Sequence, residues 1–311
     1  MKEHVKTGLT CIGDTPLLTL PNVTKGLAAT VLAKGEFFNP LSSVKDRTAL
    51  AMVEDAQRRG VLDKETVILE ATSGNTGIGL AFVGAQKGNR VVLTMPDSMS
   101  LERRKLLQAL GAEIVLTPGH LGMNGAIEKA NEIAKERGNV FITKQFDNPA
   151  NVQVHYDTTG PEIWRGACES VDIFVTGVGT GGTIMGVSRF LKEKNPDFQA
   201  VAVEPADSAV LSGGEPGPHM IQGIGAGFVP GNVDLSKIDD IIQVSNDEAV
   251  EMTRRLAKEE GLLLGISSGA NVAAAIRLAK RPENKGKRIV TVLCDGGERY
   301  LSTTLFRAEK N

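Results

Sequence analysis

Strand-like and helix-like segments alternate along most of the chain, and this alternation is the feature that most constrains its fold. Short apolar runs rich in β-branched residues, such as residues 66–71 and 90–95, are each followed by a segment with helical periodicity. The same rhythm returns in the second half, where residues 173–176, 200–204 and 288–293 predict strands. Because helices that join successive strands favour parallel pairing, the pattern predicts an α/β fold with mostly parallel sheets covered on both faces.

The length of the chain predicts two lobes rather than one core. Its 311 residues fit two packed lobes of about 150 residues each, and we expect the boundary near residues 145–151. The longest stretch without either periodicity, residues 207–234, is rich in Gly and Pro. We interpret it as a functional loop.

Charge and composition exclude several classes of protein. Lys and Arg number 35 and Asp and Glu 37, so the chain lacks the basic character of proteins that bind nucleic acids or anionic membranes. No apolar run approaches the roughly 20 residues of a membrane helix, and residues 1–5 do not resemble the start of a secretory signal. The widely spaced Cys11, Cys168 and Cys294 favour free thiols in a reducing cytoplasm. The four histidines lack ligand spacing, so no metal site is expected.

Three stretches of 16 residues carry no charged side chain: residues 71–86, 173–188 and 261–276. In each, a predicted strand ends, a cluster of Gly, Ser, Thr or Asn follows, and a helix begins. Such a junction exposes N–H groups at the positive end of a helix, where an anion can bind. Each stretch could instead be a tight turn before a buried helix. The three together favour one shared site, because loops at the carboxyl ends of parallel strands meet at one edge of the sheet.

The second uncharged stretch contains the strongest candidate for a phosphate-binding loop. Residues 176–183 follow a predicted strand, open a helix and contain the pattern G-x-G-x-x-G. With Glu204 about 20 residues further on, the same pattern is the fingerprint of a dinucleotide site, so a nicotinamide-dependent oxidoreductase is a rival interpretation. The extra Gly181 and the hydroxyl groups of Thr180 and Thr183 suit a terminal phosphate better than a pyrophosphate.

Lys45 occupies an unusual place for a lysine. Residues 39–47 end a loop and begin a helix, with Ser43 and Asp46 in the positions of a capping box. Four apolar residues share the helix face of Lys45: Ala49, Met52, Val53 and Ala56. Loss of hydration there would lower the pKa of the Lys45 amine toward neutrality and allow it to form a Schiff base. The alternative is a lysine whose stem lies on the core edge while its ammonium group reaches water.

A Schiff-base lysine combined with a separate phosphate loop fits pyridoxal 5'-phosphate better than a nicotinamide cofactor. The cofactor has one aldehyde, for Lys45, and one phosphate, for residues 179–183. Seven motifs in this order resemble those of the cysteine synthase (O-acetylserine sulfhydrylase) family of fold-type II pyridoxal-phosphate enzymes. They are residues 39–47, 72–77, 145–151, 158–164, 179–183, 222–227 and 265–269, and the resemblance extends from Ile12 to Thr303.

The resemblance implies two three-layer αβα lobes with the cofactor in the cleft between them. The smaller lobe, residues 41–144, would be mobile and would carry the loop for the substrate carboxylate. The larger lobe, residues 1–40 with 145–311, would bind the cofactor phosphate and the pyridine nitrogen.

The resemblance also implies a role for each site residue. Lys45 would form the Schiff base and act as acid and base, Asn75 would contact the cofactor ring hydroxyl, and Ser267 would contact the pyridine nitrogen. The cofactor phosphate would be bound by Gly179, Thr180, Gly181, Gly182 and Thr183. The substrate α-carboxylate would be bound by Thr72, Ser73, Thr76 and Gln145.

The implied reaction converts O-acetyl-L-serine and sulfide to L-cysteine and acetate through an α-aminoacrylate intermediate. Ser42, Lys144, Cys294 and Gly296 depart from the commoner family pattern, so thiosulfate, homocysteine or O-phosphoserine remain alternative reactants. A catalytically silent relative that acts as an interaction protein is a further alternative. The resemblance also implies a homodimer, docking of the C-terminal tail of a serine acetyltransferase, and a cytoplasmic location.

Overall fold

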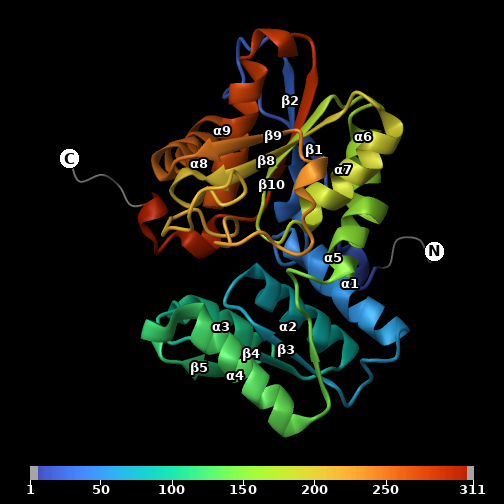
Figure 1. The fold of residues 1–311 in the computed structure, drawn as a ribbon, viewed down its shortest axis with the longest axis vertical. Helices are drawn as coiled ribbons and strands as arrows, with labels where there is room; N and C mark the ends of the chain where they lie inside the picture. The colour runs from blue at the N-terminus through green and yellow to red at the C-terminus, as the bar shows by residue number, and fades with distance from the viewer. Residues whose placement is uncertain (1–5, 307–311) are drawn as a thin grey trace. The chain divides into compact units, whose positions relative to one another are not determined.

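The computed structural model describes residues 6–306, which form two compact units. The first unit comprises residues 6–12 and 39–151, and the second comprises residues 13–38 and 152–306. Each unit is built around its own sheet (Figure 1). Residues 1–5, on which the expectation about a secretory signal depends, lie outside the described residues.

The first unit has a parallel four-stranded sheet in the order β5-β4-β3-β6, with helices on both faces. Its strands and helices are β3 (Val67–Ala71), β4 (Val91–Pro96), β5 (Glu113–Thr117), β6 (Val140–Ile142), α1 (Lys45–Arg58), α2 (Asn75–Lys87), α3 (Leu101–Ala109) and α4 (Gly122–Arg137). Successive residues of a strand point to opposite faces. Accordingly, Val67 and Leu69 pack with residues of α4, whereas Ile68 packs with residues of α1, α2 and α3.

The second unit has a six-stranded sheet in the order β1-β2-β10-β7-β8-β9, in which only the β1–β2 pairing is antiparallel. Its strands and helices are β1 (Leu17–Thr19), β2 (Thr30–Gly35), β7 (Ile173–Gly177), β8 (Gln199–Pro205), β9 (Asp240–Val244), β10 (Arg288–Leu293), α6 (Gly160–Gly166), α7 (Gly182–Lys194), α8 (Asn246–Glu260) and α9 (Ile266–Ala279). Val175 and Ile289 pack against α9, whereas Phe174 and Val290 pack against α6 and α7.

Shorter elements complete the fold. Helix α5 (Pro149–Val154) continues into a π-helical segment, His155–Thr159. Short 3-10 helices cover Leu9–Cys11, Glu36–Phe38, Gly119–Leu121, Ala206–Ser208, Leu235–Lys237, Pro282–Asn284, Glu298–Tyr300 and Thr304–Phe306. Between Ala209 and Asp234 the chain has no helix or strand, as the Gly- and Pro-rich composition of this stretch predicted.

The predicted α/β class with mostly parallel sheets is confirmed, and the main omissions lie at the sheet edges and in β2. Strands β1 and β6 have only three residues each, too few to show a periodicity. Strand β2 contains Lys34, which interrupts its apolar pattern. Lys34 is nevertheless buried, with its Nζ 2.7 Å from a carboxylate oxygen of Glu162. A paired lysine can occupy a position that its sequence suggests is exposed.

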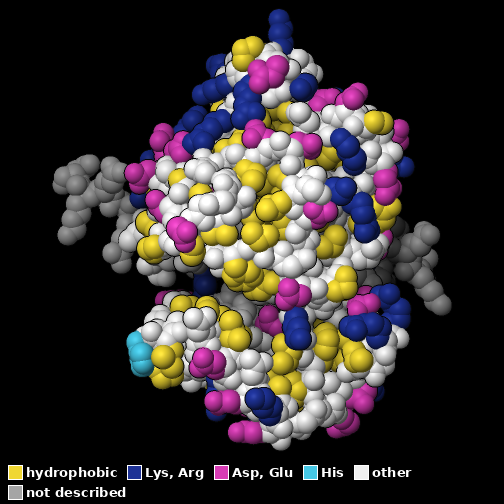
Figure 2. All heavy atoms as spheres, viewed as in Figure 1, with side chains coloured by type: hydrophobic (Ala, Val, Ile, Leu, Met, Phe, Trp, Pro, Cys, Tyr) yellow, Lys and Arg dark blue, Asp and Glu magenta, His cyan; other side chains and the backbone are white. Residues whose placement is uncertain are grey.

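The surface of the described residues mixes both signs of charge. On the face drawn in Figure 2, Lys and Arg side chains lie among Asp and Glu side chains. Within residues 6–306, none of the helices combines the length and the hydrophobicity needed to cross a bilayer. The same residues contain no group of three or more His, Cys, Asp or Glu side chains placed to hold a metal ion.

Candidate active site

Lys45 is the first residue of α1 and is half-buried. Its neighbours on the helix are as apolar as predicted, because Ala49, Met52, Val53 and Ala56 are all fully buried. Helix α2 approaches α1 closely at Gly79, where a Cβ atom would lie 2.9 Å from the Cβ of Ala49 and 3.0 Å from the carbonyl oxygen of Lys45. This close packing of the two helices fixes the backbone that carries the Lys45 amine.

The start of α1 differs from the predicted capping box. The N-cap residue is Val44, and no side chain caps the helix. Instead, the hydroxyl of Ser43 accepts a hydrogen bond from the N–H of Lys45 at 3.2 Å, and the Asp46 carboxylate accepts one from the N–H of Leu41 at 2.7 Å. The polar pair therefore shapes the turn that enters the helix, rather than closing the helix end.

The carboxylate loop predicted at residues 72–76 lies at the N-terminus of α2. Gly74 is the N-cap residue, no side chain caps the helix, and its first turn contains no acidic residue. The hydroxyl of Thr72 accepts a hydrogen bond from the N–H of Gly74 at 3.1 Å. The Thr76 hydroxyl donates to Oε1 of Gln145 at 2.6 Å, across 69 positions of sequence. The structure thus brings Gln145 to this loop, at the positive end of a helix that suits a carboxylate.

Asn75 is the first residue of α2 and is half-buried beside the same loop. Ser73, between Thr72 and the N-cap, accepts a hydrogen bond through its carbonyl oxygen from Arg103 at 3.4 Å. All six sequence-predicted site residues of the first unit therefore lie at the start of α1, at the start of α2, on the loop between β3 and α2, or on the loop that contains Gln145.

Glu70 is a buried carboxyl group that sequence reasoning did not single out. It lies on β3, two residues before Thr72, and is only 6% exposed. Burial raises the pKa of Glu70 to about 7, although hydrogen bonds from the Thr143 hydroxyl and from the N–H groups of residues 143–145 oppose the shift. The hydroxyl of Thr143 lies 2.6 Å from its Oε2. Only its apolar surroundings could have been foreseen, since its partners lie 73 positions away.

The raised pKa of Glu70 predicts a stability that depends on pH. A carboxyl whose pKa is higher in the folded than in the unfolded state favours folding below the unfolded value, and this contribution is lost as the pH rises through about 7. Between pH 5 and pH 8, the free energy of unfolding should fall by about 2.5 kcal/mol relative to that of a Glu70→Gln variant, which does not titrate. Urea unfolding of both proteins at each pH measures the difference, and parallel pH profiles would contradict the prediction.

The predicted phosphate loop connects β7 to α7 in the second unit. A Cβ atom at Gly179 would collide with the carbonyl oxygen of Gly223, and one at Gly181, where φ is +83°, would collide with Val233. Gly181 is the N-cap residue of α7, no side chain caps the helix, and its first turn contains no acidic residue. A loop of this kind offers backbone N–H groups to a phosphate, so residues 179–183 fit the phosphate of pyridoxal phosphate.

His155 supports this loop, although no motif in the sequence indicated that it would. Its ring is fully buried, with Nδ1 2.9 Å from the hydroxyl of Thr159 and Nε2 3.2 Å from the hydroxyl of Thr183. The histidine lies in the π-helical segment, a rare element that often occurs at functional sites. Its contact with Thr183 fixes a hydroxyl group of the phosphate loop.

Replacing His155 by Phe should therefore weaken cofactor binding without abolishing it. Thr183 would lose one hydrogen bond, so the dissociation constant of pyridoxal phosphate should rise about tenfold. Fluorescence titration of the cofactor-free protein measures the change. Tyr156→Phe is a matched control in the same segment, because the Tyr156 hydroxyl contacts Glu193 on the surface at 3.0 Å. Equal affinities for the His155 variant and the wild type would contradict the role.

Helix α9 supports the end of β7 through Asn271. The amide oxygen of Asn271 accepts a hydrogen bond from the N–H of Gly177 at 2.7 Å, and its Nδ2 donates to the carbonyl of Val292 at 2.8 Å. Ser267 is 5% exposed, in the first turn of α9. The N-cap residue is Gly265, so Ser267 does not occupy the cap position of this helix. A Cβ atom at Gly223 would lie 3.9 Å from the Ser267 hydroxyl, and residues 223, 179 and 267 thus lie together.

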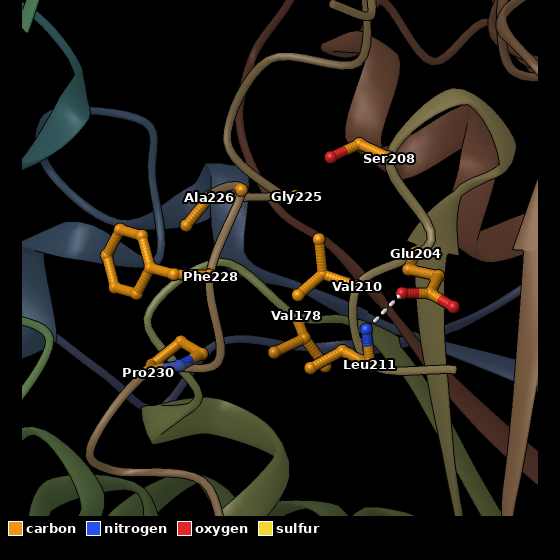
Figure 3. Close-up of a pocket in the computed structure, with 10 residues that line it drawn as sticks. Val178, Glu204, Ser208, Val210, Leu211, Gly225, Ala226, Phe228 and Pro230 are labelled. Atoms are coloured by element: carbon orange, nitrogen blue, oxygen red, sulfur yellow. Dashed lines mark hydrogen bonds between the residues drawn. The ribbon is translucent and has the colours of Figure 1, made fainter. Parts of the chain in front are cut away.

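Glu204, the acidic residue of the rival dinucleotide interpretation, has a different role. It is 1% exposed and accepts hydrogen bonds from the N–H of Leu211 at 2.8 Å and the N–H of Ser212 at 3.2 Å. Figure 3 shows Glu204 bonded to Leu211 at the side of a small pocket, which also contains Val178 and Gly225. The carboxylate holds the loop after β8, so it is not free to bind a ribose.

The site residues form two sets, a half-buried lysine with a carboxylate-binding loop in one unit and a glycine loop for a phosphate in the other. Such sets on parallel α/β units define an enzyme that uses a lysine and a phosphorylated cofactor. The model of the family described as "Pyridoxal-phosphate dependent enzyme" matches residues 9–295. The chain belongs to this family and, within it, to the cysteine synthases.

The individual relatives agree. The chain is 56% identical to a cysteine synthase of Staphylococcus aureus over 296 residues, which cover 95% of each chain. The crystal structure of a cysteine synthase (OASS) from Entamoeba histolytica is 44% identical, with a TM-score of 0.96, over 100% of this chain and 94% of that one. A hydrogen sulfide-producing enzyme from Fusobacterium nucleatum is also 44% identical, with a TM-score of 0.92, over 97% of this chain and 99% of that one. The family, its fold and its cofactor, predicted from sequence, are confirmed.

Proposed function

We propose that this chain converts O-acetyl-L-serine and sulfide to L-cysteine and acetate. The observation that carries the proposal is the group formed by Thr72, Ser73, Thr76 and Gln145 at the positive end of α2, in the same unit as Lys45. This group suits the α-carboxylate of an amino acid. The 56% identity to a cysteine synthase supports the choice of substrates.

Each cofactor contact has a proposed residue. Gly179, Thr180, Gly181, Gly182 and Thr183 hold the phosphate, Asn75 contacts the ring hydroxyl, and Ser267 contacts the pyridine nitrogen. Pyridoxal phosphate, when bound, accepts the electron pair that remains when a proton leaves the α-carbon of an amino acid. The neutral Ser267 hydroxyl does not require a protonated ring nitrogen, which favours prompt departure of a β-substituent.

Lys45 moves the proton in both halves of the reaction. In the first half, its Nζ takes the proton from the α-carbon, the bond between the β-carbon and the acetoxy oxygen breaks, and acetate leaves with the electron pair. In the second half, hydrosulfide forms a bond to the β-carbon and Lys45 returns the proton to the α-carbon. The loop at residues 72–76 and Gln145 keep the α-carbon oriented throughout. We further propose that the lobe of residues 41–144 moves when the carboxylate binds, and so excludes water.

An assay of product formation tests the substrates. The purified enzyme, loaded with pyridoxal phosphate, is supplied with O-acetyl-L-serine and sulfide, and L-cysteine is measured. In parallel arms thiosulfate or homocysteine replaces sulfide, and O-phosphoserine replaces O-acetyl-L-serine. A higher kcat/KM for O-acetyl-L-serine with sulfide than for any other pair supports the proposal, and a clear preference for another pair overturns the choice of substrates.

The proposal extends to partners and location. The C-terminal tail of a serine acetyltransferase ends in a carboxylate, which could bind the donors that bind the substrate carboxylate. A synthetic tail peptide should therefore compete with O-acetyl-L-serine, whereas the same peptide with an amidated C-terminus should not. We also propose a homodimer, which light scattering tests. The exposed thiols of Cys11 and Cys168 suit the reducing conditions of a cytoplasmic location.

A further inference from the structure

Glu70 joins three parts of the first unit that are distant in sequence. It lies next to the last residue of β3, directly before the loop at residues 72–76, and its backbone is paired with Leu93 of β4. Its carboxyl group accepts a hydrogen bond at 2.6 Å from the hydroxyl of Thr143, in the segment that follows β6. This buried carboxyl group takes no part in the proposed reaction, so its role must lie elsewhere.

The segment that contacts Glu70 has the conformation of an anion-binding loop. Lys144 has a φ of +49°, in the left-handed region that non-glycine residues seldom adopt. A left-handed residue within a turn points successive N–H groups to one side, which creates a concave site for an anion. Here the Thr143 hydroxyl donates to Oε2 of Glu70 at 2.6 Å, and the backbone N–H groups of residues 143–145 act to lower the pKa of this carboxyl, as such a site does for an anion. The Glu70 carboxyl therefore stabilises an otherwise unfavourable backbone.

Gln145 depends on this backbone for its position. Its amide oxygen accepts the hydrogen bond of Thr76 at 2.6 Å, and its carbonyl oxygen accepts one from Nδ2 of Asn151 at 2.9 Å. The Asn151 amide oxygen accepts in turn from the hydroxyl of Thr48 at 3.1 Å, one turn of α1 beyond Lys45. A displacement of residues 143–145 would thus move Gln145 relative to both the carboxylate loop and α1.

We propose that Glu70 is a positioning residue for the substrate carboxylate, because it anchors residues 143–145 and so sets the place of the Gln145 amide beside Thr76. The inference deepens the proposed function and depends on the role of Gln145 in it. In the proposed mechanism, Glu70 touches neither the substrate nor the cofactor. It acts through the loop alone.

The charge of Glu70 gives this anchor a dependence on pH. Burial is the main cause of its raised pKa of about 7. No neighbouring charge is among the causes of the shift. Lys144 is exposed, and the charged helix α4 packs on the opposite face of the sheet, because Glu70 alternates with Leu69, which packs with α4. Helix α2 has no charged side chain before Lys87. A protonated carboxyl has less capacity to accept hydrogen bonds, so substrate binding should weaken as the pH falls through 7.

Steady-state kinetics of the loaded enzyme test the inference. Glu70→Ala should raise the KM for O-acetyl-L-serine at least about tenfold, the value of one strong hydrogen bond, and leave the KM for sulfide within about twofold. Thr143→Val removes only the hydroxyl that contacts Glu70, so it should raise the KM for O-acetyl-L-serine severalfold. Glu70→Gln keeps an acceptor but no charge, so it should restore much of the affinity and remove the weakening between pH 8 and pH 6. Hydrogen exchange of residues 143–147 should be faster in Glu70→Ala than in the wild type.

Thr94→Val is the matched control. Thr94 is fully buried on the adjacent strand, and its hydroxyl donates to the carbonyl of Ala126 at 2.7 Å, away from residues 143–145. The control should lose stability yet keep the wild-type KM. The inference is wrong if Thr143→Val and Glu70→Gln both keep the wild-type KM and pH profile, or if Thr94→Val raises the KM equally. If Glu70→Ala does not fold, the KM values of Thr143→Val, Glu70→Gln and Thr94→Val test the inference in its place. A wild type that does not consume O-acetyl-L-serine would refute the proposed function itself.

Discussion

Replacing Lys45 by alanine should reduce cysteine formation by about 10⁴-fold or more, because the proposed mechanism assigns to this one amine both proton transfers and the bond to the cofactor. The measurement is the initial rate of L-cysteine formation from O-acetyl-L-serine and sulfide. A second measurement does not depend on turnover. Borohydride treatment followed by peptide mapping should find a pyridoxyl group on the peptide that contains Lys45 in the wild type, and none there in the variant.

Lys87→Ala is the control for this result. Lys87 lies in the same unit, at the end of α2, and its Nζ is 3.1 Å from the partly exposed carboxylate of Glu54. Surface ion pairs of this kind contribute little, so this variant should keep its activity and its pyridoxyl label. A Lys45→Ala variant that keeps full turnover, or a wild-type label on a different lysine, would reject the assignment.

Replacing Gly179 by alanine should have the second-largest effect. The new methyl group would collide with the carbonyl oxygen of Gly223, which is backbone and cannot rotate away as a side chain can. The phosphate loop would have to move, and the dissociation constant of pyridoxal phosphate should rise about a hundredfold, equivalent to about 2.7 kcal/mol. Titration of the cofactor-free variant, followed by cofactor absorbance, measures the loss.

Gly26→Ala separates this effect from a general loss of stability. At Gly26, where φ is +81°, a Cβ atom would meet nothing within 4 Å, so alanine there strains the backbone without a collision. This control should be less stable yet bind the cofactor as the wild type does. If Gly179→Ala binds pyridoxal phosphate with wild-type affinity, residues 179–183 do not hold the phosphate.

The sequence was sufficient for the parts of the site that have a local signature. The junctions at residues 71–76 and 177–183 combine the end of a strand, small polar residues and the start of a helix. The structure has this order of elements at both places. The spacing of Lys45 to Ala49 and Met52 also predicted that Lys45 shares the apolar face of its helix, and both of these residues are fully buried. Local periodicity fixes such features before any tertiary contact forms.

The supporting residues could not be foreseen, since each depends on a contact between distant segments. His155 meets Thr183 across 28 positions, Glu70 meets Thr143 across 73, and Asn271 meets Gly177 across 94. A single buried polar residue in a sequence shows no periodicity and no spacing. Its role appears only when the partner that satisfies its hydrogen bonds is known.

The close approach of α1 and α2 at Gly79 has a consequence for how the proposed chemistry proceeds. The backbone carbonyl of Lys45 packs directly against Gly79 of α2, where even an added Cβ atom would be too close. In the proposed mechanism, any travel between the cofactor and the α-carbon must therefore come from rotation within the flexible methylene tether of the side chain. The Lys45 amine thus changes position only by side-chain rotation about a fixed Cα atom. A bulkier residue at position 79 would displace that Cα atom without altering the chemistry of the amine.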